Sequence, residues 1–185
     1  TSRRQRQMCI RDRLKVLTSQ FPDKPKEEIR ILDIGTGPGF FPVILAEAGY
    51  HVDAVDYTEG MLEKAKENAG DLCRNIRFLR MDAQKLDFED NTFDVVISRN
   101  LTWNLEHPDV AYREWVRVLK VGGRLLNFDA NWYGYLYEEE QRKAYENDRK
   151  NVENNSLDDH YLCTDIERME RIALQVPLSK ISRPQ

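Results

Sequence analysis

Short apolar runs alternate with amphipathic segments over most of the chain. The apolar runs predict buried strands at residues 29–35, 51–56, 76–82, 93–99 and 124–130. The segments between them have apolar residues at helical spacing and predict helices at about 39–48, 58–69 and 108–119. Strands that alternate with helices over short connections indicate an α/β fold, in which a doubly wound, mostly parallel sheet carries helices on both faces.

The two ends of the chain have a different character. Residues 1–12 are rich in arginine and lack apolar periodicity, so we expect a disordered or artefactual leader there and place the sheet-forming domain at 13–130. Residues 131–185 are rich in Glu, Lys, Asn and Tyr and lack a strand-like run. They predict two helices, at roughly 136–152 and 164–175, that form a lid or insert within the same domain.

The composition is typical of a globular protein in a reducing compartment. Of the 185 residues, 41% are hydrophobic and 32% are charged, and the net charge of -4 disfavours nucleic acid and anionic membranes as partners. No apolar run reaches the roughly 20 residues that span a bilayer, and the start shows no signal-peptide pattern. Cys9, Cys73 and Cys163 have no metal-ligand spacing, so we expect free thiols, no metal and a cytoplasmic location.

Candidate chemistry begins at the glycine-rich loop after the first predicted strand. Residues 33–39 read Asp-Ile-Gly-Thr-Gly-Pro-Gly, and glycines at alternate positions permit a tight turn and a close approach of backbone to a ligand. The loop also leaves the first N–H groups of the next helix facing whatever binds. A dinucleotide fingerprint, G-x-G-x-x-G, would need a glycine at position 40, where this chain has Phe40. A bulky ring there opposes NAD as the ligand.

This loop resembles the first motif of class I S-adenosylmethionine (SAM) dependent methyltransferases, specifically the type 11 methyltransferase domain. The resemblance covers residues 29–129, with five landmarks in the family's order. Residues 117–126 are similar to the family's turn into strand five, with Val121 in place of the usual proline. Residues 99–102, Arg-Asn-Leu-Thr, resemble a run in quinone-biosynthesis C-methyltransferases of that group. The resemblance implies a Rossmann-like sheet of order 3-2-1-4-5. It also implies strands 6 and 7, for which the sequence offers no candidates, so we expect a truncated domain.

The resemblance implies SAM as the cofactor and assigns its binding to residues at or just beyond the ends of the first four strands. These residues are Asp33, Gly35, Thr36, Gly37, Gly39, Asp56, Tyr57, Met61, Met81, Asp82, Ala83, Ser98 and Arg99. The Asp56 carboxylate would accept the two ribose hydroxyls, and Asp82 would accept from the adenine amine. Tyr57 and the two methionines would sandwich the adenine, while Ser98 and Arg99 would offer backbone carbonyls to the ammonium group. The aspartates could instead serve only their own turns.

The acceptor side is expected just after the fourth and fifth strands, where aromatic residues gather. They are Trp103, Trp132, Tyr133, Tyr135 and Tyr137. Such rings could cover an apolar acceptor or attract the sulfonium charge, and we assign substrate binding to all but Tyr135. Core packing would also explain the set. His107 is the candidate general base because an imidazole titrates near neutral pH, although it could merely precede a helix and face solvent.

The predicted function is therefore SAM-dependent methyl transfer to a small-molecule acceptor by in-line displacement. The fourth strand is not followed by the N-P-P-Y/F run that methyltransferases of nucleobases or glutamine use, so O-, C- or N-methylation of a metabolite stays open. Three alternatives stay open as well: a non-catalytic or truncated SAM-binding protein, an NAD-dependent oxidoreductase, and a nucleic-acid methyltransferase that uses the arginine-rich start.

Overall fold

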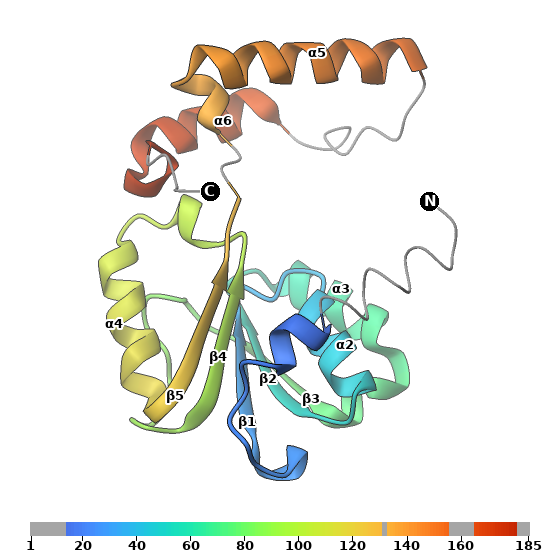
Figure 1. Ribbon diagram of the computed structural model, residues 1–185, viewed down its shortest axis with the longest axis vertical. Helices are drawn as coiled ribbons and strands as arrows, with labels where there is room; N and C mark the ends of the chain where they lie inside the picture. The colour runs from blue at the N-terminus through green and yellow to red at the C-terminus, as the bar shows by residue number, and fades with distance from the viewer. Residues whose placement is uncertain (1–13, 131–132, 156–164, 181–185) are drawn as a thin grey trace. The chain divides into compact units, whose positions relative to one another are not determined.

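The computed structural model describes residues 14–130, 133–155 and 165–180, and its described part contains a five-stranded sheet (Figure 1). The strands are β1 Arg30–Ile34, β2 His51–Asp56, β3 Ile76–Arg80, β4 Phe93–Arg99 and β5 Leu119–Phe128. All neighbouring strands pair in parallel, in the order β3-β2-β1-β4-β5. The predicted fold class and strand order are confirmed. The predicted leader, residues 1–12, lies outside the described residues.

Three helices join the strands and cover the sheet. They are α2 Phe40–Glu47, α3 Glu59–Ala69 and α4 Pro108–Val118. Figure 1 shows α2 and α3 on one side of the sheet and α4 on the other, as a doubly wound arrangement requires. Short 3-10 helices occur at η1 Lys26–Glu28 and η2 Gly70–Asn75, and residues 14–18 are helical as well.

The chain divides into two compact units. The first contains the described residues up to Arg99 together with Asp109–Phe128, and therefore holds the whole sheet. The second contains Asn100–Pro108 and the described residues from Asp129 onward. Its helices are η3 Thr102–Asn104, η4 Gly134–Leu136, α5 Glu139–Asn155, α6 Ile166–Gln175 and η5 Pro177–Lys180. The two long helices predicted after the sheet are present, but each begins and α5 ends a little later than expected, because η4 occupies the start of the first predicted range.

The middle strands of the sheet are buried on both faces. Residues 31–34 of β1 and 93–98 of β4 are all buried, which is the pattern of parallel strands with a helix layer on each side. On the α2 side, Ile31 and Ile97 pack with Leu17 in the main apolar cluster. Full burial of a Leu or Ile side chain contributes roughly 1.5–3 kcal/mol to folding, so this cluster fixes the frame from which the strand ends project.

The start of β5 differs from the prediction. The glycine pair was expected to form a turn before a strand at 124–130, whereas β5 begins at Leu119 and ends at Phe128. The register shifts there, because Phe93 pairs with Leu119 and Val95 with Arg124, which leaves residues 120–123 as a bulge opposite Asp94. Gly123 is needed at this point, since a Cβ would approach Leu119 Cδ1 to 2.8 Å and the Asp94 carbonyl oxygen to 2.9 Å. Long-range pairing with β4 thus overrides the local turn signal.

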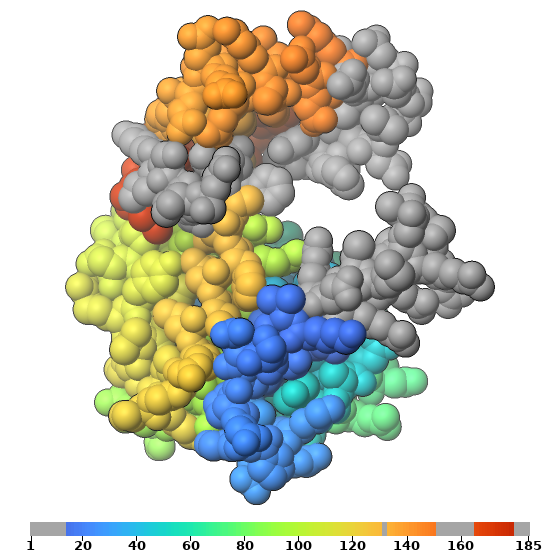
Figure 2. Space-filling view, in the orientation of Figure 1, coloured from blue at the N-terminus to red at the C-terminus, as the bar shows by residue number. Residues whose placement is uncertain are grey.

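Asp94 joins three segments at the amino end of the sheet. Its carboxylate accepts hydrogen bonds from Lys24 Nζ (2.6 Å), Lys120 Nζ (2.9 Å) and the Arg30 backbone N–H (3.0 Å). Figure 2 shows the blue segment that begins at residue 14 lying against the yellow strand β5, and these ion pairs join the two. Burial by itself would raise the pKa of Asp94, but the hydrogen bonds from the two lysines and from Arg30 lower it to about 2.

Acid should weaken the fold through Asp94. An unfolded Asp titrates near pH ~3.9, so the carboxylate of the folded chain contributes stability that is complete above that pH and is lost as the pH falls toward about 2. The D94N variant should lose about 2–3 kcal/mol of unfolding free energy at pH 7 and should show a flatter pH dependence between pH ~4 and ~2. Urea titrations at several pH values measure both quantities.

The exposed carboxyl of Asp87 provides the matched control for this experiment. D87N removes a carboxylate that makes no comparable set of hydrogen bonds, so it should keep the acid dependence of the parent chain. Equal curves for D94N and the parent would show that the ion pairs around Asp94 do not stabilise the fold.

Candidate functional site

The strand order defines one edge of the sheet as the place where a ligand binds. In an open parallel sheet, ligands bind beyond the carboxyl ends of the strands, where the strand order reverses. Here the reversal falls between β1 and β4, which pair with each other at the centre of the sheet. The predicted cofactor-binding residues lie among the last residues of β1, β2 and β4 or in the segments that follow β1, β2 and β3, so the fold brings them to this edge.

The glycine loop follows β1 and turns sharply. Its three glycines all have positive φ angles, 69° at Gly35, 52° at Gly37 and 86° at Gly39, which residues with a side chain rarely adopt. A Cβ at Gly39 would lie 3.0 Å from Ala65 Cβ of α3, so this glycine permits close helix packing. A Cβ at Gly37 would meet nothing within 4 Å, so the loop presents bare backbone to open space at this point.

Asp56, the last residue of β2, contacts the glycine loop directly. Its Oδ2 accepts the backbone N–H of Gly37 (2.9 Å) and its Oδ1 accepts that of Thr58 (2.9 Å). The N–H groups of Gly35 and Thr36 donate instead to the Val55 carbonyl, at 2.9 and 3.0 Å. Hence the first loop amides are held by β2 and Asp56. A carboxylate offers about four acceptor positions, so Asp56 keeps capacity for hydroxyl donors of a ligand.

The loop after β3 carries Asp82 and Ala83 and is held by α4. Asp82 Oδ1 accepts the Gln84 backbone N–H at 2.8 Å, so this carboxylate does serve its own turn. The Trp115 indole donates to the Ala83 carbonyl at 2.9 Å, and Arg117 donates to the Leu86 carbonyl at 2.9 Å. These bonds from α4 fix the position of Asp82 relative to the sheet.

Apolar side chains stand exposed beside the strand-end carboxylates. Tyr57 is 68% exposed and Met61 is 45% exposed, and Met81 is partly buried. The Met81 backbone N–H donates to the Asp56 carbonyl at 3.1 Å, which joins the ends of β2 and β3. The Arg80 guanidinium carbon lies 5.9 Å from the Tyr57 ring centroid. Exposed apolar side chains next to polar groups are common where a flat ligand binds.

The end of β4 adds one polar group and one charge. Ser98 is fully buried, and among the described residues its Oγ has no hydrogen-bond partner. The Arg99 guanidinium carbon lies 4.5 Å from the Phe40 ring centroid and 5.7 Å from that of Phe41, both at the start of α2. Sequence reasoning used Phe40 only to exclude NAD and missed its contact with Arg99. An aromatic pair that follows a glycine loop is the signal that could have suggested a cation partner.

Asp33 is a buried ionisable residue at the carboxyl edge of the sheet. Only 3% of the residue is exposed, and burial raises the pKa of its carboxyl to about 7, while Thr36 and Arg99 act in the opposite direction. The nearby Asp56 carboxylate raises the pKa further. A carboxyl with this pKa changes charge near neutral pH, which is typical of a functional site.

The predicted acceptor-side residues lie in the second unit. The rings of Trp103 and Tyr133 are 4.9 Å apart, and the Trp103 indole donates to the Asn100 carbonyl at 2.9 Å. The Tyr137 hydroxyl donates to the Ala173 carbonyl at 3.1 Å, so it packs against α6. His107 has a side chain that is 62% exposed, with Nε2 3.8 Å from Glu106 Oε1. Trp132 lies outside the described residues.

Tyr135 makes the strongest internal contacts of the aromatic set. Its ring stacks on Tyr145 at 4.1 Å, and its hydroxyl donates to Glu170 at 2.8 Å. Burial and this glutamate raise the pKa of the Tyr135 hydroxyl. The residue therefore packs within the second unit.

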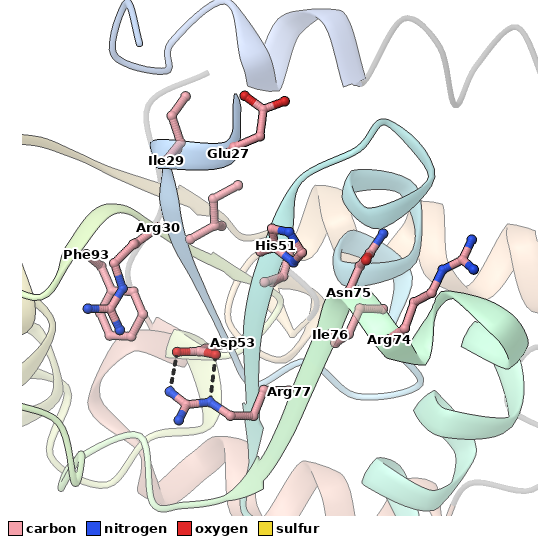
Figure 3. A pocket seen from close by; sticks show the side chains of 12 residues that line it. Glu27, Ile29, Arg30, His51, Asp53, Arg74, Asn75, Ile76, Arg77 and Phe93 are labelled. Atoms are coloured by element: carbon pink, nitrogen blue, oxygen red, sulfur yellow. Dashed lines mark hydrogen bonds and ion pairs between the residues drawn. The ribbon is translucent and has the colours of Figure 1, made fainter. Parts of the chain in front are cut away.

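A cavity of about 350 Å³ opens at the opposite, amino end of the sheet (Figure 3). Its lining includes Arg30, His51 and Ile76, the first residues of β1, β2 and β3. Figure 3 shows the Arg77 guanidinium against Asp53, to which it donates two hydrogen bonds of 2.9 and 2.6 Å. Because this cavity lies away from the glycine loop, we do not assign it to the cofactor.

Membrane-spanning helices and clusters of metal-ligating side chains are both absent from the ranges that the structure describes. No helix there is long and apolar enough to cross a membrane, and no group of three or more His, Cys, Asp or Glu side chains is arranged to hold a metal ion. Cys73 is a free thiol, as expected, whereas Cys9 and Cys163 lie outside the described residues.

The sheet and its carboxyl edge define a Rossmann-like α/β protein, and comparison with known proteins narrows this class. A family model described as a methyltransferase domain, of type 11, matches residues 32–127, just over half of the chain. The chain therefore belongs to this methyltransferase family, which confirms the resemblance found in the sequence.

Two relatives of this chain are also named as methyltransferases. Demethylmenaquinone methyltransferase of Clavibacter sepedonicus is 41% identical over 98 residues, which are 52% of this chain and 39% of the relative. Ubiquinone/menaquinone biosynthesis C-methyltransferase UbiE of Pseudomonas putida is 41% identical over 103 residues, with 52% and 40% covered. The chain thus spans about two fifths of the length of these curated relatives.

Solved structures show the same fold. A SAM dependent methyltransferase from Aquifex aeolicus is 32% identical with a TM-score of 0.52, over 59% of this chain and 58% of that one. A protein from Pyrococcus horikoshii OT3 is 30% identical with a TM-score of 0.61, over 76% and 65% of the two chains. SAM, the cofactor predicted from the sequence, is the cofactor of this family.

The raised pKa of Asp33 predicts that neutral pH destabilises the ligand-free protein. The folded chain keeps this proton up to about pH 7, whereas an unfolded Asp releases it near pH ~3.9. Stability from this group is therefore present at acid pH and falls as the pH rises toward 7. The D33N variant, which is neutral at every pH, should exceed the parent by about 1–4 kcal/mol in unfolding free energy at pH 8, with the difference closing toward pH ~4.

Urea denaturation from pH 4 to pH 8 measures this difference. D71N, which changes an exposed carboxyl, serves as the control and should follow the parent curve. A D33N variant that is less stable than the parent at pH 8 would mean that the folded chain needs the ionised carboxylate.

Proposed function

We propose that this chain binds SAM at the carboxyl edge of the sheet and transfers its methyl group to a small-molecule acceptor. The observation that carries the proposal is the contact between Asp56 and the Gly37 N–H, at 2.9 Å. It joins the glycine loop to a strand-end carboxylate, and Met81 N–H joins the next strand end to the same residue. Family membership identifies SAM as the cofactor, and the glycine loop with its neighbouring strand ends offers a site that would fit it.

The residues at the edge fit the parts of the cofactor. The bare backbone at Gly37 leaves room for the methionyl part, and the free acceptor positions of Asp56 suit the ribose hydroxyls. Tyr57, Met61 and Met81 would enclose the adenine, with Asp82 accepting from its amine. Further polar groups for the amino acid part are the buried Asp33 carboxyl and the Ser98 Oγ, which has no hydrogen-bond partner in the described part of the chain. Asp33 becomes an acceptor for an ammonium group once it is ionised.

Catalysis by this chain is mainly a matter of orientation. Bound SAM supplies an activated methyl group, so the protein needs to hold the acceptor in line with that group and to exclude water. The names of the relatives mention demethylmenaquinone and the biosynthesis of ubiquinone and menaquinone. We infer an aromatic diol related to a quinone as the acceptor class, with Trp103 and Tyr133 contacting it through their rings. His107 is retained as the candidate for proton removal.

Cofactor binding should depend on Asp56. In the D56N variant the amide keeps an acceptor for one N–H but loses the negative charge, so the dissociation constant for SAM should rise by about 10- to 100-fold. Isothermal titration with SAM and with its demethylated product measures the change. D53N alters a carboxylate on the same strand that pairs with Arg77 and should leave SAM binding within about 3-fold.

Methyl transfer is tested with labelled SAM and 1,4-dihydroxynaphthalene, followed by a metabolite extract. Labelled product from the aromatic diol supports the proposed function and acceptor class. If labelled product forms from the extract alone, methyl transfer is supported but the acceptor is not an aromatic diol. Tight SAM binding with no product from either source would favour a non-catalytic SAM-binding protein. Absence of SAM binding by the parent chain would overturn the proposal.

A further inference from the structure

A hydrogen-bonded pair of polar side chains, the buried Thr102 and the partly buried Asp129, joins the two places where the chain leaves the sheet. Strands β4 and β5 end side by side, with Arg99 paired to Phe128, and the chain passes into the second unit after each of these residues. Asp129 follows Phe128 directly. Its Oδ2 accepts the backbone N–H of Thr102 at 3.1 Å and also the Thr102 hydroxyl hydrogen. Thr102 is fully buried, so solvent does not compete for these two donors.

The loop between Arg99 and this pair has a constrained backbone. Asn100 has a φ of 55°, in the left-handed region that residues other than glycine rarely occupy. Its carbonyl accepts the Trp103 indole N–H at 2.9 Å, and the Leu101 carbonyl accepts the Asn104 N–H at 3.2 Å. A strained residue persists only where surrounding bonds determine its conformation. Asp129, just beyond the end of β5, supplies two such bonds to Thr102, two residues after Asn100 in the loop.

The position of this loop bears on the reaction because of where the loop begins. Ser98 pairs with Ile34, so β4 ends beside the strand from which the glycine loop starts. Asn100 is one peptide bond beyond Arg99, whose guanidinium lies over Phe40. The same loop carries Trp103, a proposed acceptor contact. In-line transfer depends steeply on the distance and angle between acceptor and methyl group, so a small displacement of the loop lowers the rate.

We propose that Asp129, acting through Thr102, is a positioning residue that sets the acceptor-side loop Asn100–Asn104 without taking part in cofactor binding. This inference rests on the proposed methyl transfer. It separates two functions along the chain: Asp56 and the glycine loop bind the cofactor, and the Thr102–Asp129 pair orients the loop that meets the acceptor.

The threonine hydroxyl allows a nearly isosteric test. T102V keeps the shape and the backbone N–H but removes the donor to Asp129, while T102S keeps the hydroxyl. With labelled SAM and 1,4-dihydroxynaphthalene, T102V should lower kcat by about 10-fold with a SAM dissociation constant within about 2-fold of the parent. T102S should restore most of the rate. T92V is the matched control, because the Thr92 hydroxyl donates to the nearby Glu89 carbonyl on an exposed turn.

Hydrogen exchange of residues 100–104 provides a readout that does not need turnover. Exchange should be faster in T102V and D129N than in the parent and close to the parent in T102S. A T102V enzyme with unchanged kcat, or with SAM affinity reduced in step with kcat, overturns the positioning role. If the parent binds SAM but methylates nothing, the proposed function fails. If hydrogen exchange of residues 100–104 is unchanged in both T102V and D129N, the hydrogen bonds of Asp129 do not hold the loop, whatever the outcome for methyl transfer.

Discussion

The hydrogen bonds of Asp56 are the interaction on which the candidate site depends. One carboxylate oxygen holds Gly37, the other holds Thr58, and the backbone carbonyl of the same residue accepts from Met81. These partners belong to the loops that follow β1, β2 and β3. Hydrogen bonds to a charged group contribute about 1.5–3 kcal/mol each, so a single residue aligns three loops that the sheet merely brings near one another. The parallel register makes this possible, because Asp56 stands opposite Arg80 at the end of β3.

Two buried aspartates at opposite ends of the sheet have pKa values that are shifted in opposite directions. Asp94, at the amino side, receives two lysines and a backbone N–H, and its pKa falls to about 2. Asp33, at the carboxyl edge, is as deeply buried, and burial raises its pKa to about 7 against the opposing effects of Thr36 and Arg99. The first carboxylate is compensated within the protein. The second stays under-compensated at the edge where a positively charged ligand group is expected, and local departures of this kind are common at functional sites.

The sequence predicted the parts of the structure that depend on local pattern. Strands and helices up to α4 follow from apolar periodicity, and the meeting of Asp56 with the glycine loop follows from the rule that parallel strands end at one edge. The bulge at Gly123 was missed because its cause is the Asp94 carbonyl on a neighbouring strand. The contact between Arg99 and Phe40 and the tie between Thr102 and Asp129 were missed for the same reason, since each joins segments distant in sequence.

The family match and the structure divide the chain at nearly the same residue, which bears on how an acceptor is selected. The match ends at residue 127, where β5 is about to end, and so excludes everything from Asp129 onward. The matched range thus holds most of the first unit and residues 100–108 of the second, and the rest of the second unit lies beyond it. Within that unit Tyr135 and Tyr137 are engaged with Glu170 and Ala173, so their hydroxyls serve internal packing. Trp103 and Tyr133 contact each other through their rings, whose centroids lie 4.9 Å apart, so this part of the second unit is also held together by packing between its own side chains.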